Sequence, residues 1–571
     1  MFSLPRKLLS PVIAIVVTLL LSGPVSSESL ISEEWETFLK EKVSFGGFLE
    51  NTSGLSVSHG SRFFNTSNRF IMNRFTVQPE VNVDMTDWAK FFISWRFVKE
   101  PRYNAEAKSR ERSVTYFPAA PVKPLSNRFY DEDSFKPWEA VLDLRPDDQL
   151  KLRFGRQFIS WGETDGIRLL DLINPQDLTF SPPAAPNLFN LDETRIPSWG
   201  LRAHYTVRPV SNTILEFFAL PGSLDEAEQR VDEIVGSNDT GDRKVRYGRW
   251  SAHPETRLFV GGTNRFGNLF SDPLRVRLGL GSCVGAGCIV IPSTVRELPD
   301  AGDSWKLGAR FSHSIGKLNF GLGYIWGYNP QASDMVFKVR SLSCASPVLA
   351  ACTIAGAAPT VAKLALLNDR TSIFAGQFNY PVGDAFNVPI NTTVRGEMAF
   401  LPDKPYNISK FPGNFGLKAS AHPKYPNGVV EKNTLRYAVG FDRTTLIPFL
   451  HPDDPWRAFN LSFQVFQSII FDHEDGIHPF STAERIKRFS TTLTFRMGTG
   501  YFGDTILPDV FLAYDPEGYW SANPAISYVP PGNEKLRFSL VGTLYGGRNK
   551  FKSFGLFDEK DSIFLKMRYQ F

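Results

Sequence analysis

The last ten residues, Ser562-Ile-Phe-Leu-Lys-Met-Arg-Tyr-Gln-Phe571, alternate between two kinds of side chain. One face of this stretch is apolar and carries Ile563, Leu565, Met567, Tyr569 and Phe571. Such a period of two predicts a β-strand. A strand at a chain end leaves an unpaired edge and a bare apolar face. Pairing with the first strand would close a barrel and turn that face to lipid. The alternative is a soluble sandwich that ends in an amphipathic strand.

Similar alternating segments recur from residues 42–57 to residues 561–571 of the 571-residue chain. Their number is about eighteen, within a range of 16–18, and a bacterial barrel requires an even number. We therefore expect an all-β fold, a transmembrane antiparallel β-barrel with long extracellular loops and one loop folded inward.

The connections between these segments alternate between short and long. Short connections include Thr86-Asp87, Asp147-Asp148 and Ile315-Gly316, with Thr444 to Pro455 as the one exception. Long connections cover 100–136, 158–196, 221–303, 328–369, 401–432, 471–485 and 547–560. Tight periplasmic turns and extended outer loops explain this pattern, which a sandwich has no reason to show.

The amino terminus is typical of a secretory signal. Residues 1–27 combine Arg6 and Lys7, an apolar core and the small residues Val25-Ser26-Ser27. The alternative is a retained membrane anchor. We expect residues 28–41 to form a periplasmic segment and residues 42–571 to form the barrel.

The connection at 158–196 differs from the other loops because it is moderately apolar and richer in acids than in bases. An acidic, semi-apolar loop beside a basic lumen is expected to fold inward and narrow the pore. The candidate constriction residues are Trp161, Glu163, Asp165, Arg168, Asp171, Asn174 and Asp177. The alternative is a loop packed over the barrel mouth.

Basic side chains prevail on the strand faces opposite the lipid-facing aromatic residues. The candidate basic wall consists of Lys151, Arg153, Arg202, Arg208, Lys306, Arg310 and Arg568. A barrel of about eighteen strands leaves a water-filled lumen. If Arg153, Arg202 and Arg310 are solvated, anions would be favoured. The alternative is that these arginines pair with internal loops.

Four cysteines occur in two close pairs, Cys283 with Cys288 and Cys344 with Cys352. Because both pairs fall in long loops of an exported chain, we expect two local disulfides. Neither pair has the spacing of a zinc site, and no cofactor or catalytic residues are indicated. His473 and His478 could supply metal ligands, but a solvated loop is the simpler interpretation. The net charge of +4 is small for this length and argues against nucleic acid as a partner.

One block of the chain resembles a known bacterial family, that of the domain of unknown function 1302 (DUF1302). The similar residues are Gly155-Arg-Gln157, Trp161-Gly-Glu163 and Ile173-Asn-Pro-Gln-Asp177, with further similarity at Pro197–Arg202, Gly302–Gly308 and in the tail. The resemblance implies an outer-membrane barrel of poorly defined function, in transport of small or hydrophobic compounds, without catalytic residues.

The sequence thus predicts an outer-membrane channel for passive or facilitated passage of small solutes. The alternatives are a carrier of hydrophobic compounds or lipids, and a surface-binding or enzymatic barrel. The expected partners are outer-membrane lipid and lipopolysaccharide, small-molecule solutes and, through the terminal Phe571, the barrel assembly machinery.

Overall fold

The structure is a computed structural model that describes residues 40–571 with gaps. The gaps are 59–69, 103–136, 177–180, 190, 208–211, 223–288, 298–303, 330–335, 345–359, 368–369, 386–387, 409–423, 479–484, 549–552 and 559. The chain divides into residues 1–44 and residues 45–571. The first unit contributes only residues 40–44 to the described structure, and the predicted signal at 1–27 lies outside it.

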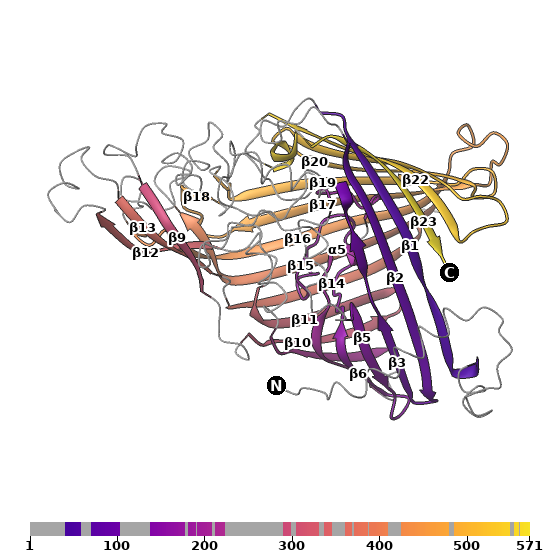
Figure 1. Cartoon of the computed structure of the whole chain (residues 1–571), viewed down its shortest axis with the longest axis horizontal. Coiled ribbons are helices and arrows are strands. Elements are labelled where there is room, and N and C mark those ends of the chain that lie inside the picture. The colour runs from indigo at the N-terminus through magenta and orange to yellow at the C-terminus, as the bar shows by residue number, and fades with distance from the viewer. Residues whose placement is uncertain are drawn as a thin grey trace. The chain divides into compact units, whose positions relative to one another are not determined.

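The second unit is built almost entirely from strands, which run round a single sheet (Figure 1). The sheet contains β1 (Val43–Ser56), β2 (Phe70–Thr86), β3 (Ala89–Ser94), β4 (Phe97–Lys99), β5 (Glu139–Leu144), β6 (Leu150–Gln157), β7 (Ser198–Thr206), β8 (Thr213–Leu220), β10 (Lys306–Ile315), β11 (Leu318–Tyr328), β14 (Arg370–Ala385), β15 (Val388–Ile408), β16 (Val429–Leu446), β17 (Ala458–Ile470), β18 (Ile477–His478), β19 (Phe489–Gly498), β20 (Ile506–Asp515), β21 (Tyr519–Tyr528), β22 (Leu536–Gly547) and β23 (Ser562–Gln570).

The barrel has eighteen strands, as the sequence predicted. The sheet holds 20 segments. The segments β3 and β4 pair with β2 in one continuous register and therefore count as one strand. The two-residue β18 pairs with the end of β15 and is not counted as a strand of the barrel. Each strand is antiparallel to the next along the barrel, and β23 closes the ring on β1 from Phe48↔Gln570 to Ser56↔Ser562. The predicted closure by the terminal strand is therefore confirmed.

The terminal strand also shows how the two faces of the wall differ. The apolar residues of β23 and the final Phe571 point outward and are 37–54% exposed: Ile563, Leu565, Met567, Tyr569 and Phe571. On the other face, Phe564 is fully buried among Met72, Val541 and other side chains inside the barrel. A belt of exposed apolar side chains round a closed wall suits lipid, because the backbone groups are satisfied within the sheet.

The connections follow the predicted alternation with one exception. The strands β20 and β21 are joined at the long-loop end by residues 516–518 alone. This turn is tight because Gly518, at φ +97°, donates its backbone N–H to the Asp515 carbonyl at 2.8 Å. The sequence pattern overlooked this short outer turn.

Two of the long outer connections carry strands of their own, which the sequence did not predict. The strands β9 (Ile289–Glu297), β12 (Val336–Cys344) and β13 (Thr360–Leu367) form a separate three-stranded sheet, with β13 antiparallel to β12 and parallel to β9. Cys344 is the last residue of β12, whereas Cys283, Cys288 and Cys352 lie outside the described residues. The two disulfides stay predictions.

Candidate functional site: a loop across the lumen

The connection between β6 and β7 lies inside the barrel, where Figure 1 shows its short helix α5 (Leu191–Thr194) within the ring of strands. We call residues 158–176 the first arm and residues 181–196 the second arm. The two arms pack on different parts of the wall.

The first arm inserts an apolar cluster into the lumen. Its fully or almost fully buried residues are Ile159, Trp161, Leu169, Leu170, Leu172 and Ile173. They pack against inward-facing residues of β8, β11 and β14 to β17: Phe218, Leu220, Ile325, Ile373, Ala375, Ala399, Leu401, Ala438 and Phe466. Burial of apolar surface on both sides fixes this arm to the wall.

Trp161 is the central residue of the first arm and is 1% exposed. Its ring meets Phe218 edge-on at 5.2 Å between centroids, and its indole N–H donates to Glu216 Oε1 at 3.0 Å. On β11, a Cβ at Gly323 would lie 2.9 Å from the Trp161 ring. The glycine therefore makes room for the indole against the wall.

We predict that Trp161→Ala destabilises the barrel by about 3–5 kcal/mol, the usual cost of removing a buried tryptophan side chain. The substitution also takes the indole donor from Glu216. The measurement is the midpoint temperature at which the folded, fast-migrating form is lost on an SDS gel. Trp199→Ala is the control, because Trp199 is 51% exposed. Equal midpoints for the two variants would contradict the packing described for Trp161.

Polar contacts join the tip of the first arm to β15 and β17. Asp165 forms an ion pair with Arg395 and accepts a hydrogen bond from Gln464 Nε2 at 2.9 Å. The buried Glu397 carboxylate accepts the backbone N–H of Glu163. These contacts hold the tip against the wall while the Glu163 side chain remains exposed.

The base of the loop is closed by Asn174. Its side-chain oxygen accepts the Ile159 N–H at 2.8 Å, and its amide donates to the Ile196 carbonyl at 3.1 Å. Close by in the sequence, Asp171 accepts from Arg168 Nε at 2.6 Å and from Arg195 Nε at 2.7 Å. Asn174 and Asp171 thereby join the first arm to the end of the second arm.

The second arm packs on β2, β4, β22 and β23. Ala185, Leu188 and Phe189 are buried against wall residues that include Met72 and Phe564. Asn187 donates two hydrogen bonds to Asn523 of β21: its backbone N–H to the side-chain oxygen at 2.9 Å and its side-chain amide to the backbone carbonyl at 2.7 Å. Since the first arm is bound to β8, β11 and β14 to β17, the loop extends between two separate parts of the wall.

Glu193 is the charged anchor of the second arm. It pairs with Arg568 Nη1 at 2.9 Å and with Lys566 Nζ at 3.5 Å, and its backbone carbonyl accepts from Arg96 at 3.0 Å. Burial opposes ionisation of Glu193, but Lys566, Arg568 and Arg96 outweigh it and hold the pKa of this carboxyl below its ordinary value. Glu50 contacts the same lysine at 3.1 Å.

Six of the seven predicted constriction residues lie in the first arm inside the barrel: Trp161, Glu163, Asp165, Arg168, Asp171 and Asn174. Asp177 lies outside the described residues. The wall partners Arg395 and Glu397 were not singled out from the sequence. The sequence signal for Arg395 and Glu397 as lumen residues is weak, because the same face of β15 continues with the apolar Ala399 and Leu401.

The predicted basic wall is extensively paired with acids. Arg153 contacts Asp143 at 2.7 Å, and Arg202 and Arg310 contact Glu216 at 2.6 and 2.5 Å. Each of these three arginines therefore has a carboxylate partner, although Arg202 and Arg310 share one and Arg153 keeps 39% of its side chain exposed; the anion preference stays a prediction. Arg568 fits the alternative stated for the basic wall, in which arginines pair with an internal loop, because it contacts Glu193 of the second arm.

The two lysines of the predicted wall differ in burial. Lys306 is 1% exposed and donates to the loop carbonyls of Leu172 at 2.5 Å and Ile173 at 3.2 Å. Lys151 is exposed on β6. Arg208 lies outside the described residues.

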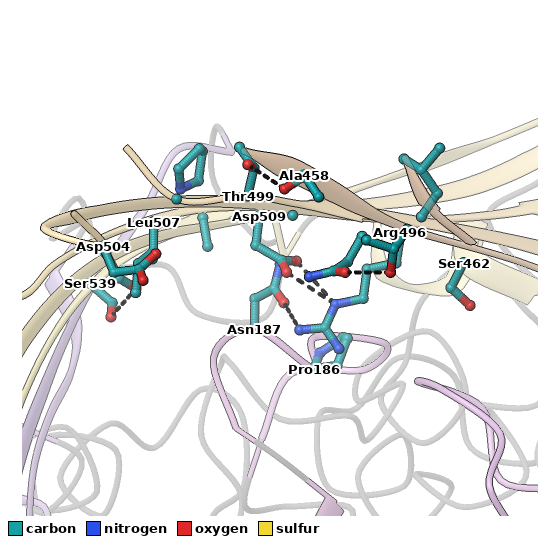
Figure 2. A pocket seen from close by; sticks show the side chains of 18 of the residues that line it. Pro186, Asn187, Ala458, Ser462, Arg496, Thr499, Asp504, Leu507, Asp509 and Ser539 are labelled. Atoms are coloured by element: carbon teal, nitrogen blue, oxygen red, sulfur yellow. Dashed lines mark hydrogen bonds and ion pairs between the residues drawn. The ribbon is translucent and has the colours of Figure 1, made fainter. Parts of the chain in front are cut away.

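A large cavity lies beside the second arm, toward the short-turn end of the barrel. This cavity, which we call the inner vestibule, has a volume of about 1080 Å³. Figure 2 shows Asn187 and Pro186 of the loop facing Arg496 and Asp509 of the wall. Arg496 and Asp509 form an ion pair at 3.1 Å. The lining is mainly polar and charged, which suits water and hydrophilic solutes.

A second cavity lies on the other side of the loop, toward the long-loop end. This cavity, which we call the outer cavity, has a volume of about 380 Å³ and is lined by the first-arm residues Ile167, Arg168 and Leu169 together with β15 to β17 and β19. Among the described residues, no group of His, Cys, Asp and Glu could hold a metal ion. Within the same part of the chain, no helix is long and apolar enough to cross a membrane.

Comparison with known proteins identifies a family and several similar folds. The model of the family described as "Protein of unknown function (DUF1302)" matches residues 10–571. Among solved structures, Pseudomonas aeruginosa OccK9 (OpdG) is 7% identical, with 93% of this chain and 99% of that chain covered and a TM-score of 0.42. P. aeruginosa OccK2 (OpdF), in complex with glucuronate, is 7% identical, with coverages of 93% and 98% and a TM-score of 0.41. P. aeruginosa OpdK with vanillate is 9% identical, with coverages of 94% and 99% and a TM-score of 0.39. No curated protein matches the sequence.

Proposed function

The chain belongs to the DUF1302 family, and for this member we propose the function of an outer-membrane channel through which small solutes pass passively. One observation carries the proposal: a loop fixed to separate parts of the wall lies between two cavities inside a closed, lipid-facing barrel. A barrel of eighteen strands encloses an aqueous lumen. The loop restricts that lumen and selects solutes by size and local charge.

The charges inside the lumen form a mosaic of paired groups. Two guanidinium groups share one carboxylate at Glu216 and again at Asp171. Conversely, Arg395 is shared by Asp165 and Asp442. Selection therefore depends on the local field at each cluster along the path, and a uniform anion preference is not part of the proposal.

The lining of the inner vestibule favours hydrophilic solutes over hydrophobic compounds and lipids. Charged side chains of both signs border it, such as Arg496, Asp509 and Arg568. The seam between β1 and β23 is paired along nearly the whole of β23, so this seam offers no lateral exit. We also propose that the exposed terminal Phe571 is read by the barrel assembly machinery.

The proposal is tested by reconstituting the purified barrel into planar lipid bilayers. We expect stepwise currents of small unit conductance, because the loop narrows the lumen. Replacing residues 163–172 by a Gly-Ser segment of equal length should raise the unit conductance severalfold, since it removes the buried Leu169, Leu170 and Leu172 of the first arm. Bilayers that stay silent with a folded barrel would overturn the channel function.

A further inference from the structure

A third cavity lies at the tip of the first arm, toward the short-turn end of the barrel. This cavity, which we call the arm-tip cavity, has a volume of about 140 Å³ and is bordered by Thr164 of the first arm and by residues of β10, β11, β14 and β15. It is smaller than a pocket for a drug-sized ligand, which measures roughly 300–1,000 Å³. A solute that it holds is therefore a single small ring or a short chain.

The wall of the arm-tip cavity is hollow at Gly321. This glycine of β11 pairs with Ser312 of β10 on one side and with Gln377 of β14 on the other. A Cβ at Gly321 would lie 3.1 Å from Gln377 Cγ and 3.4 Å from Ser312 Oγ, so the two side chains flank the hollow closely. The hydroxyl group and the amide group can therefore contact the same solute across the glycine.

A second row of polar side chains lies one step nearer the turn between β10 and β11. Ser314, Asn319 and Asn379 are neighbours in the register of β10, β11 and β14, and all three border the arm-tip cavity. Ser314 donates to Asn319 Oδ1 at 2.5 Å. Together the two rows form a patch of hydroxyl and amide groups on three adjacent strands.

Most groups of this patch have no partner within the wall. Among the described residues, the side chains of Ser312, Gln377 and Asn379 form no hydrogen bond. The inner vestibule differs, because its hydroxyl groups at Ser527 and Ser539 share a hydrogen bond at 2.7 Å. Hydroxyl and amide groups both donate and accept hydrogen bonds. The patch therefore matches a solute whose own groups do both, which is the property of a hydroxyl group.

The charges around the arm-tip cavity do not favour an anion. Arg395 is the one arginine or lysine among the described residues that border it, and its guanidinium is shared by Asp165 and Asp442. The buried Glu397 also borders the cavity and contacts no base in the part of the chain that the structure describes. In this group three carboxylates accompany one guanidinium, so the local field disfavours a further negative charge.

We propose that the arm-tip cavity is a binding site for a small polyhydroxylated solute that carries no negative charge. The hydroxyl groups of the solute exchange hydrogen bonds with Ser312, Gln377 and Asn379, and the hollow at Gly321 admits the solute between these side chains. The site deepens the proposed function, on which it rests, because it names a class of solute that binds beside the first arm.

The site is tested by ligand-observed NMR titration of the barrel with D-xylose, in a detergent without a sugar head group. Tetrahydropyran has the ring of xylose without its hydroxyl groups, and xylonate carries hydroxyl groups together with a carboxylate. We expect xylose to bind about tenfold or more tightly than either, since several hydrogen bonds contribute. Gln377→Ala and Asn379→Ala should each weaken xylose binding by about fivefold. Neither variant removes a side-chain hydrogen bond of the described structure.

Asn460→Ala is the matched control, because Asn460 borders the inner vestibule and not the arm-tip cavity. This variant should bind xylose like the unmodified protein. Gly321→Ala places a methyl group in the hollow between Ser312 and Gln377 and should weaken xylose binding by about tenfold.

Equal affinity for xylose and tetrahydropyran, equal affinity for xylose and xylonate, or an equal loss in Asn460→Ala and Asn379→Ala would overturn the site. A conducting barrel that does not bind xylose rejects the site alone, whereas xylose binding to a barrel without current rejects the channel.

Discussion

Replacing Glu193 with glutamine is expected to raise the single-channel conductance and to make the open current fluctuate. The substitution removes the carboxylate that pairs the second arm with Lys566 and Arg568. Glu50 still pairs with both bases, but a hydrogen bond to a charged group contributes about 1.5–3 kcal/mol, so the docked position of this arm loses stability. The measurement is the distribution of unit currents in planar bilayers.

The same ion pairs predict how the unmodified channel responds to pH. The pKa of Glu193 is held below its ordinary value in the folded barrel. Its contribution to docking is therefore complete above the ordinary glutamate pKa and is lost as the pH falls through the lowered folded pKa. Conductance should stay constant from neutral to mildly acidic pH and rise only in stronger acid.

Glu163→Gln is the matched control for Glu193→Gln. Both residues belong to the same loop and lose the same charge, but the Glu163 side chain is exposed and its contact with Glu397 uses the backbone N–H. We expect unit currents close to those of the unmodified protein. If both variants conduct alike, the Glu193 pairs do not hold the second arm.

The fold was largely predictable because its determinants repeat along the chain. The alternation in the terminal strand indicated the closure on β1, and the count of alternating segments indicated the number of strands. The inward course of the loop followed from its unusual composition, since Trp161 and Leu169 have no place in a solvated loop. Each of these signals is local, so it can be read without knowledge of tertiary contacts.

The electrostatics of the lumen were less predictable, because they depend on distances across the barrel. Arg310 and Glu216 are neighbours only through the pairing of β10 with β8. Asp165 and Arg395 are 230 positions apart. A count of bases on the inner face overlooks such partners, and it therefore leaves open which arginines are paired.

Leu540→Arg is expected to impair the barrel severely. Leu540 is 50% exposed on the outer face of β22, opposite Leu565 of β23. An arginine on the lipid face near the middle of the membrane costs about 2–4 kcal/mol. The measurement is the urea concentration that unfolds the barrel in lipid vesicles, and the variant should unfold at a clearly lower concentration.

Ser527→Arg places the same side chain on the opposite face of the adjacent strand. Ser527 borders the inner vestibule, where the arginine can stay hydrated and meet carboxylates such as Asp509. Its urea midpoint should therefore lie close to that of the unmodified protein. If the two variants unfolded alike, the outer face would not be in lipid. Unequal midpoints of the expected sign agree with a wall whose adjacent residues face lipid and water, because the introduced side chain is the same in both.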